Sequence, residues 1–229
     1  MTFEPSRTFG LVAGLGVGAG IFYYKSLVDA HLARGLTPRL LLVHADVRRV
    51  ISLAAARETN QLAEYLAGLL QQLARGGAEI ASIPAFTPQL CAAELDAITP
   101  LPLVSLLDAI AAEVERRRFR RVALFGARVT METQMFGRLH GTEVIMPAPA
   151  EIDTIADTYG RVVEQASASK EDFDTLHTLA HTLITRERLD GIILAGTDLA
   201  FVFNPANADF PCIDGARVHI EAIMREMMS

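Results

Sequence analysis

The sequence predicts an α/β protein built from two similar parallel-sheet domains. Short apolar runs alternate with longer amphipathic stretches along the whole chain. Repeated strand, helix, strand units form right-handed crossovers, which build a parallel sheet covered by helices on both faces. The length of 229 residues and the 51% hydrophobic content are sufficient for one large or two small cores and exclude a disordered chain.

Eight apolar runs are the predicted strands, because each has the length and composition of a buried strand. They are residues 9–13, 39–44, 79–84, 103–106, 121–126, 143–146, 191–195 and 211–213. The clearest helix is predicted over residues 52–75, where leucines recur at helical spacing before Gly76 and Gly77 end the pattern. A last helix is predicted over residues 216–228.

The two halves of the chain share a pattern that indicates a duplication. Residues 77–87 and residues 190–197 each combine a turn, a buried strand and a small-residue loop ending in threonine. We therefore expect an N-terminal domain of residues 1–105 plus 211–229 and a C-terminal domain of residues 106–210. Ligands of open parallel sheets bind beyond the carboxyl ends of the strands, so we expect a site in a cleft between two facing domains.

Charge and motif content exclude several classes of function. A net charge of −6 provides no basic face for phosphates, so no nucleic-acid partner is expected. The uncharged run of residues 9–24 is too short and too rich in glycine for a membrane span, so no membrane partner is expected. The two cysteines, Cys91 and Cys212, form no disulfide framework, which favours the reducing cytoplasm.

No metal is expected from the sequence. His177 and His181 stand four residues apart on a predicted helix, which is a spacing found in metal sites. No glutamate adjoins them and no third ligand is visible along the chain. A polar helix face is the preferred interpretation of the pair.

The loop after the first predicted strand contains glycine at positions 14, 16, 18 and 20. This spacing is similar to a dinucleotide fingerprint, for which Asp46 after the second strand would be the ribose-binding acid. The same glycines suit any small anion that approaches backbone N–H groups at a helix start. Nucleotide binding through residues 14–20 is therefore one alternative.

Three segments together carry a family resemblance. Residues 13–20 read Ala-Gly-Leu-Gly-Val-Gly-Ala-Gly, and an aromatic cluster with a base follows at residues 22–25. Residues 126–132 read Gly-Ala-Arg-Val-Thr-Met-Glu, and the chain closes with Asp214 and His219. The chain thus resembles the cofactor-independent aspartate/glutamate/hydantoin racemase superfamily, in particular its aspartate racemase branch. The resemblance covers nearly the whole chain and implies a small amino or carboxylic acid ligand, no cofactor and a homodimer.

The sequence departs from the family pattern at both catalytic cysteines. The resemblance places Ala85 at the first cysteine position and Gly196 at the second. Racemisation without a cofactor needs a base on one face of the α-carbon and an acid on the other, and neither residue can carry a proton. Cys91 and Cys212 are interpreted as small buried hydrophobic residues. We therefore expect a family member that has lost two-cysteine racemisation.

The same loops retain residues suited to binding an acid. The resemblance implies that Arg48 and Lys170 contact substrate carboxylates by charge-assisted hydrogen bonds, with solvated surface charges as the alternative. Thr87 and Thr197 offer hydroxyls, with helix N-capping as the alternative. The expected ligand-binding set is Gly14, Gly16, Arg48, Ala85, Phe86, Thr87, Thr130, Lys170, Gly196 and Thr197.

Asp198 and His219 are the candidates for catalysis in place of the thiols. Asp198 occupies the family's glutamate position and His219 follows the last strand, while His44 and Asp46 at the end of the second strand are weaker candidates. A carboxylate or imidazole with a tuned pKa can act as the base in a one-base elimination or decarboxylation, and a structural imidazole is the alternative for both histidines. Three functions stay open: an acid-binding or regulatory protein, an isomerase or lyase that uses Asp or His, and a nucleotide-binding protein.

Overall fold

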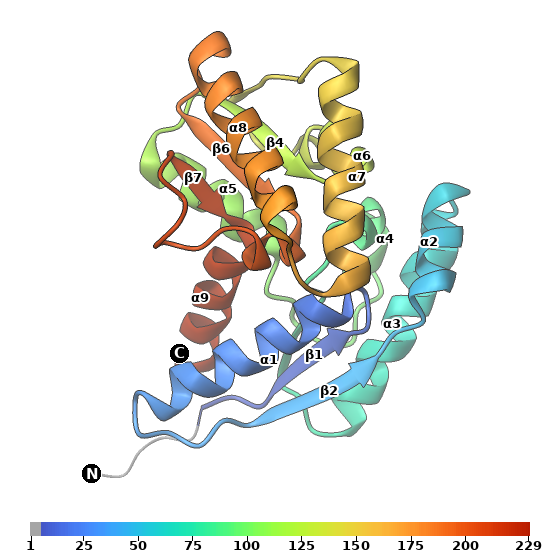
Figure 1. The fold of residues 1–229 in the computed structure, drawn as a ribbon. Coiled ribbons are helices and arrows are strands. Elements are labelled where there is room, and N and C mark those ends of the chain that lie inside the picture. The colour runs from blue at the N-terminus through green and yellow to red at the C-terminus, as the bar shows by residue number, and fades with distance from the viewer. Residues whose placement is uncertain (1–5) are drawn as a thin grey trace. The chain divides into compact units, whose positions relative to one another are not determined.

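The computed structural model describes residues 6–229, which fold into two compact units (Figure 1). Unit 1 extends from the start of the described chain to Ser105 and also includes His219–Ser229. Unit 2 comprises Leu106–Val218. Each unit contains its own parallel sheet, which confirms the predicted α/β fold class.

The sheet of unit 1 has three parallel strands in the order β2-β1-β3. The central strand β1 (Phe9–Ala13) is buried at all five residues and lies between β2 (Leu40–His44) and β3 (Ile80–Ser82). Helix α1 (Val17–Leu32) packs on β1, and α3 (Thr59–Arg75) packs on β1 and β2 (Figure 1). The other helices are α2 (Val47–Ala55), η1 (Thr87–Cys91), α4 (Ala92–Asp96) and α9 (Gly215–Met227), which runs from unit 2 into unit 1.

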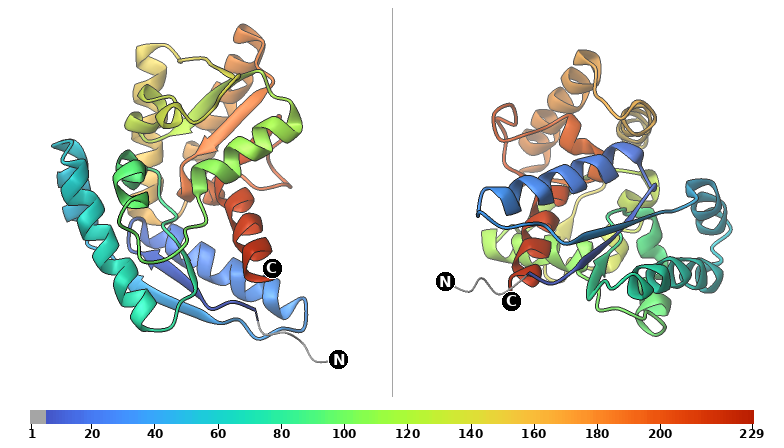
Figure 2. Two further views of the ribbon diagram at one scale, coloured as in Figure 1. Left: turned by 180° about the vertical axis from the view of Figure 1, so that it is seen from behind. Right: turned by 90° about the horizontal axis from the view of Figure 1, so that it is seen from below.

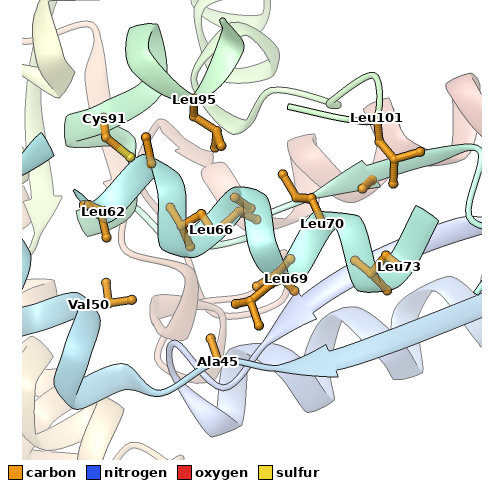
Figure 3. Packing of buried hydrophobic residues seen from close by; sticks show 14 of the residues in the cluster. Ala45, Val50, Leu62, Leu66, Leu69, Leu70, Leu73, Cys91, Leu95 and Leu101 are labelled. Atoms are coloured by element: carbon orange, nitrogen blue, oxygen red, sulfur yellow. The ribbon is translucent and has the colours of Figure 1, made fainter. Parts of the chain in front are cut away.

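The leucines of α3 form the centre of the hydrophobic core of unit 1. Leu62, Leu66 and Leu70 recur every fourth residue, so they lie on one face of the helix, and all three are fully buried. Figure 3 shows them between the β2 side of the unit and a layer that contains Cys91 and Leu95. Each buried leucine contributes roughly 1.5–3 kcal/mol, so the amphipathic pattern accounts for much of the stability of this unit. The burial of Cys91 confirms its interpretation as a small core residue.

The sheet of unit 2 has four parallel strands in the order β5-β4-β6-β7. These strands are β4 (Arg121–Gly126), β5 (Glu143–Val144), β6 (Gly191–Ala195) and β7 (Cys212–Asp214). The views of Figures 1 and 2 place α5 (Leu106–Arg117) on one face of this sheet, and α7 (Pro149–Gln165) and α8 (Lys170–Glu187) on the other. Three short helices complete the unit: α6 (Arg128–Glu132), η2 (Met135–Gly137) and η3 (Thr197–Phe201). In both units the earliest strand lies between the next two, which agrees with the predicted duplication.

Two predicted elements differ in the structure. The predicted strand at residues 103–106 is reduced to one bridge between Leu103 and Ala81, because the chain enters α5 at Leu106. The single helix predicted over residues 52–75 is two helices, α2 and α3. They are separated at Arg57, whose φ of 55° lies in the left-handed region and cannot continue a helix.

The end of the chain is divided differently from the expected domains. Residues 211–229 were assigned to the N-terminal domain, whereas β7 pairs with β6 along the open edge of the second sheet, with Ile192 aligned to Cys212. Only His219–Ser229 group with unit 1, where the backbone N–H of Arg7 donates to the carbonyl of Met227 at 2.9 Å.

The glycine-rich run of residues 9–24 forms β1, its loop and the first half of α1. Within residues 6–229, no helix combines the length and the hydropathy that a membrane crossing requires.

Candidate ligand site at the strand ends

The glycine loop of unit 1 is shaped by the close approach of two strand-end loops. Gly14 has a φ of +89°, and a Cβ on it would lie 2.7 Å from the carbonyl oxygen of Ala45. Gly16, with a φ of +143°, precedes the first residue of α1 and contributes no side-chain cap. The positive φ angles favour glycine at both positions, and the close contact with Ala45 requires it at Gly14.

Asp46 and Arg48 stand after β2. Asp46 is the N-cap of α2, since its Oδ1 accepts from the backbone N–H groups of Arg48 and Arg49 at 2.9 and 3.3 Å. Its own backbone N–H donates to the hydroxyl of Tyr65 at 2.6 Å. The Asp46 carboxylate, which a nucleotide-binding protein would use to bind the ribose, therefore caps a helix in this structure. The side chain of Arg48 is exposed, while neighbouring Arg49 lies over the Tyr65 ring at 4.5 Å.

The loop after β3 brings Ala85, Phe86 and Thr87 to the end of the same sheet. Ala85 and Phe86 are buried, at 5% and 4% exposure, so the residue predicted at the first cysteine position is a methyl group in a packed environment. The Gln89 amide donates to the Ala85 carbonyl at 2.9 Å and fixes the loop. Thr87 is half-buried and is the first residue of η1, whereas Phe86 holds the N-cap position and makes no side-chain cap bond. Thr87 therefore does not N-cap this helix.

His219 lies in a buried polar network of unit 1, close to the strand ends. Its Nε2 is 3.0 Å from the carbonyl oxygen of Val104, which can only accept, so Nε2 carries the proton. Its Nδ1 lies 3.0 Å from the Tyr23 hydroxyl, and Ser82 Oγ lies 2.9 Å from Nε2. Burial lowers the pKa of His219 to about 4. The imidazole is therefore neutral near pH 7, with both ring nitrogens hydrogen-bonded. Helix α9, which carries His219, lies beside α1, which carries Tyr23 (Figure 2).

In unit 2, an aromatic ring closes off Gly196, the residue that the family resemblance predicts at the second cysteine position. Gly196 has an extended backbone, with a φ of −150°. A Cβ built on it would lie 2.4 Å from Cε2 and 2.7 Å from Cζ of Tyr159, a residue of α7. Atoms at such distances overlap, so the Tyr159 ring fills the space that any side chain at residue 196 would need.

Tyr159 is held where it is by the loop that follows β6. The Thr197 hydroxyl and the Asp198 backbone N–H both bond to the Tyr159 hydroxyl. Burial, and then the charge of Asp198, raise the pKa of this phenol, so it stays protonated at neutral pH. Thr197 and Asp198 are buried, at 2% and 1% exposure. Gly196, not Thr197, holds the N-cap position of η3.

Thr130 follows the end of β4, where Gly126 makes a close approach to β6. A Cβ on Gly126 would lie 2.2 Å from the carbonyl oxygen of Ala195, so glycine is required there. Thr130 in the next helix is fully buried, and its Oγ1 has no hydrogen-bond partner among the described residues. A buried hydroxyl without a partner is unfavourable by about 1–3 kcal/mol, which marks Thr130 as a position where a ligand atom would be stabilising.

The remaining predicted residues are placed as follows. Lys170 is the first residue of α8, is 86% exposed and pairs with Asp174 at 2.5 Å. Cys91 donates from Sγ to the Pro88 carbonyl at 3.2 Å, and burial raises its pKa to about 12. Burial also raises the pKa of Cys212, a half-buried residue of β7. Neither thiol is poised as a thiolate base.

The structure thus gathers the predicted residues in two groups. Gly14, Gly16, Ala85, Thr87 and His219 belong to unit 1, and Thr130, Gly196, Thr197 and Asp198 belong to unit 2. Tyr159 was missed by the sequence analysis. It precedes Gly196 by a whole helix and two loops, and no local motif points from one residue to the other.

Comparison with known proteins identifies the family. A family model described as Asp/Glu/Hydantoin racemase matches residues 12–223. The fold is similar to that of a candidate Asp/Glu racemase from Yersinia pestis, with 23% identity over 97% of this chain and 100% of that chain and a TM-score of 0.84. An aspartate racemase homologue from Pyrococcus horikoshii OT3 is similar over 97% of this chain and 100% of its own, with 21% identity and a TM-score of 0.82.

An aspartate racemase from Picrophilus torridus is similar over 96% of this chain and 94% of that chain, with 16% identity and a TM-score of 0.79. The family model spans most of the chain and the structural matches share the α/β fold with parallel sheets. This chain therefore belongs to the Asp/Glu/hydantoin racemase family.

Proposed function

We propose that this family member binds a small amino or dicarboxylic acid at its strand-end loops and does not catalyse racemisation by two cysteines. The observation that carries the proposal is the Tyr159 ring, 2.4 Å from the site where Cβ of residue 196 would begin. A thiol at residue 196 is sterically incompatible with this ring. The packing around residue 196 is therefore consistent with a family member that has no cysteine there.

The chemistry of the remaining groups supports the same conclusion. Two-base racemisation needs one group that removes the α-proton and another that delivers a proton to the opposite face. The Tyr159 phenol has a raised pKa, so it is protonated at neutral pH and cannot accept a proton, and the His219 imidazole is neutral with both nitrogens engaged. Ala85 offers no proton at the other family position. A matched acid and base pair is not supplied by these residues.

Binding of an acid is supported by the donors that the loops offer. The partnerless Thr130 hydroxyl is suited to an oxygen atom of a small acid. Arg48 is exposed and offers a guanidinium for a carboxylate. Lys170 is shared with Asp174, so it is the weaker of the two predicted cationic contacts. We also predict that both domains contribute to binding one ligand and that the protein is a homodimer.

A second candidate function rests on Asp198. This carboxylate is 1% exposed at the end of β6, beside the Tyr159 hydroxyl. A buried carboxylate at a strand end is suited to act as a general base, which one-base isomerases and lyases of small carboxylic acids require. Nucleotide binding is less well supported, because the Asp46 carboxylate caps α2.

Proton exchange in D₂O separates these functions. The protein is incubated with each enantiomer of aspartate and glutamate, and deuterium at Cα is followed by NMR. We expect no incorporation above the protein-free rate, together with a rise in melting temperature for at least one small acid, because a ligand that binds only the folded state stabilises it. Incorporation of deuterium would contradict the loss of racemisation.

Asp198→Asn distinguishes the second candidate from the first. If a small dicarboxylic acid loses carbon dioxide or a leaving group in the presence of the wild-type protein and not of Asp198→Asn, the chain is a one-base enzyme. Thr130→Val is the matched variant for binding, since it removes one hydroxyl and keeps the shape. A stabilisation by acids that is unchanged in Thr130→Val, or stabilisation by NAD(H) alone, would contradict the proposed site.

A further inference from the structure

Three potential metal ligands converge on the surface of unit 2. They are His177 and His181 of α8 and Asp209, which precedes β7. The Nε2 atoms of the two histidines lie 2.7 and 2.9 Å from the same atom, Oδ1 of Asp209. All three ligand atoms fall within 4.8 Å of one another.

The helix and its aromatic neighbours hold the two imidazoles together. Residues four apart on a helix lie on one face, and the two rings have centroids 4.6 Å apart. Phe173, one turn earlier, stacks on His177 at 5.1 Å. Phe210 contacts the His177 and His181 rings edge-on at 6.0 and 5.7 Å. Packing therefore restricts the rotation of both histidines, which lowers the entropy lost when they bind a ligand together.

The hydrogen bonds of the cluster converge on one atom. Oδ1 of Asp209 lies within hydrogen-bond distance of both Nε2 atoms, so the two imidazoles point toward a single position. A metal ion bound by Nε2 replaces the proton on that nitrogen, and Nδ1 of the same ring can carry the proton instead.

The geometry needs only a small adjustment to hold an ion. Zinc binds histidine nitrogen and carboxylate oxygen at about 2.0–2.2 Å, so ligand atoms in a tetrahedral site are roughly 3.3 Å apart. The two hydrogen-bonded separations of 2.7 and 2.9 Å must therefore open by a few tenths of an ångström. Asp209 is 66% exposed and lies on a loop, so this movement is accessible.

We propose that His177, His181 and Asp209 form a binding site for Zn²⁺ or a similar divalent transition-metal ion, with the fourth position open to water. Two imidazoles and one carboxylate are ligands that zinc accepts, whereas Mg²⁺ and Ca²⁺ prefer sites made of oxygen atoms. The bound ion would link the segment before β7 to α8. The sequence analysis expected no metal because Asp209, the third ligand, lies 28 residues beyond His181.

Titration of the full chain, purified without a histidine tag and stripped of metal, tests the proposal. Isothermal titration calorimetry with Zn²⁺ is expected to give one ion per chain and no detectable binding of Mg²⁺. Asp209→Asn and His181→Asn each remove one ligand and are expected to weaken Zn²⁺ binding by roughly 100-fold or more, since even outer-shell changes weaken metal sites by 10–100-fold. Asp174→Asn, an exposed carboxylate on the same helix, is the matched control and should bind as the wild type does.

Two further readouts keep the result independent of folding. Circular dichroism establishes that the variants, altered only at half-buried or exposed positions, keep the wild-type fold. Hydrogen exchange of residues 204–210 should slow on addition of Zn²⁺ in the wild type and not in Asp209→Asn. Zn²⁺ binding that persists with the same affinity in His181→Asn and Asp209→Asn, or no Zn²⁺ binding by the wild type, would overturn the proposal.

Discussion

Replacing Gly196 by alanine tests whether the Tyr159 ring fills the space that a side chain at residue 196 would need. The new Cβ would lie 2.4 and 2.7 Å from Cε2 and Cζ of the Tyr159 ring. The backbone at residue 196 is extended, so alanine adopts it without strain, and any destabilisation must come from the ring. Bonds from Thr197 and Asp198 hold the phenol, which prevents an easy retreat.

The expected magnitude follows from two opposing effects. Inserting a methyl group into a packed site destabilises a protein by about 1–3 kcal/mol. A compatible glycine-to-alanine change stabilises it by about 0.4–1 kcal/mol, because the unfolded chain loses conformational freedom. We therefore expect Gly196→Ala to lower the free energy of unfolding by about 1–2 kcal/mol, equivalent to a fall in melting temperature of roughly 2–8 °C for a chain of this size.

The effect should change sign when the ring is removed. In a Tyr159→Ala background the same Gly196→Ala change should stabilise the protein by about 0.4–1 kcal/mol, which gives a coupling energy of about 1–3 kcal/mol between the two sites. Gly160→Ala is the matched control, since a Cβ on Gly160 meets nothing within 4 Å. That variant lies within α7 and should be stabilised by about 0.5–1 kcal/mol.

Urea unfolding followed by circular dichroism measures all four variants. A Gly196→Ala protein as stable as the wild type, or an equal effect in both Tyr159 backgrounds, would refute the steric argument. The ring would then be free to move, and residue 196 would be open to a thiol. The proposed loss of racemisation would lose its main support.

Two further predictions concern buried titratable groups. The pKa of His219 is about 4 in the folded protein against an ordinary value of 6.5, so the folded state binds fewer protons than the unfolded state between these pH values. The contribution of His219 to the free energy of unfolding is therefore complete above pH 6.5 and is lost as the pH falls toward 4. His219→Gln should therefore lose less free energy of unfolding between pH 7 and pH 5 than the wild type does. In the wild type the loss from this group reaches up to about 3 kcal/mol near pH 4. Parallel pH profiles of the two proteins would show that the imidazole is not buried in the neutral form. Cys91 is fully buried with a pKa raised to about 12, so Ellman's reagent should modify it only after unfolding in urea, and its rapid modification in the native protein would contradict this burial.

The sequence by itself determined the elements whose signal is local. Strands β1, β4 and β6 end where their apolar runs end, because a buried parallel strand must be apolar on both faces. The glycine loop of residues 14–20 was predicted after the first strand, where the structure has the loop between β1 and α1. The family resemblance was also readable, since it rests on short contiguous motifs that a family model over residues 12–223 matches.

The tertiary structure alone decided the features that join distant parts of the chain. The pairing of β7 with β6 depends on which sheet offers an open edge, and the strand's own sequence does not encode this. His219 is neutral because it is fully buried, in a network with Tyr23 and Val104 that come from distant parts of the sequence. Tyr159 reaches Gly196, and Asp209 reaches His177 and His181, only because helices α7 and α8 pack on the second sheet. Spacing along a chain predicts a helix face or a strand, whereas side chains from separate elements meet only after the core has packed.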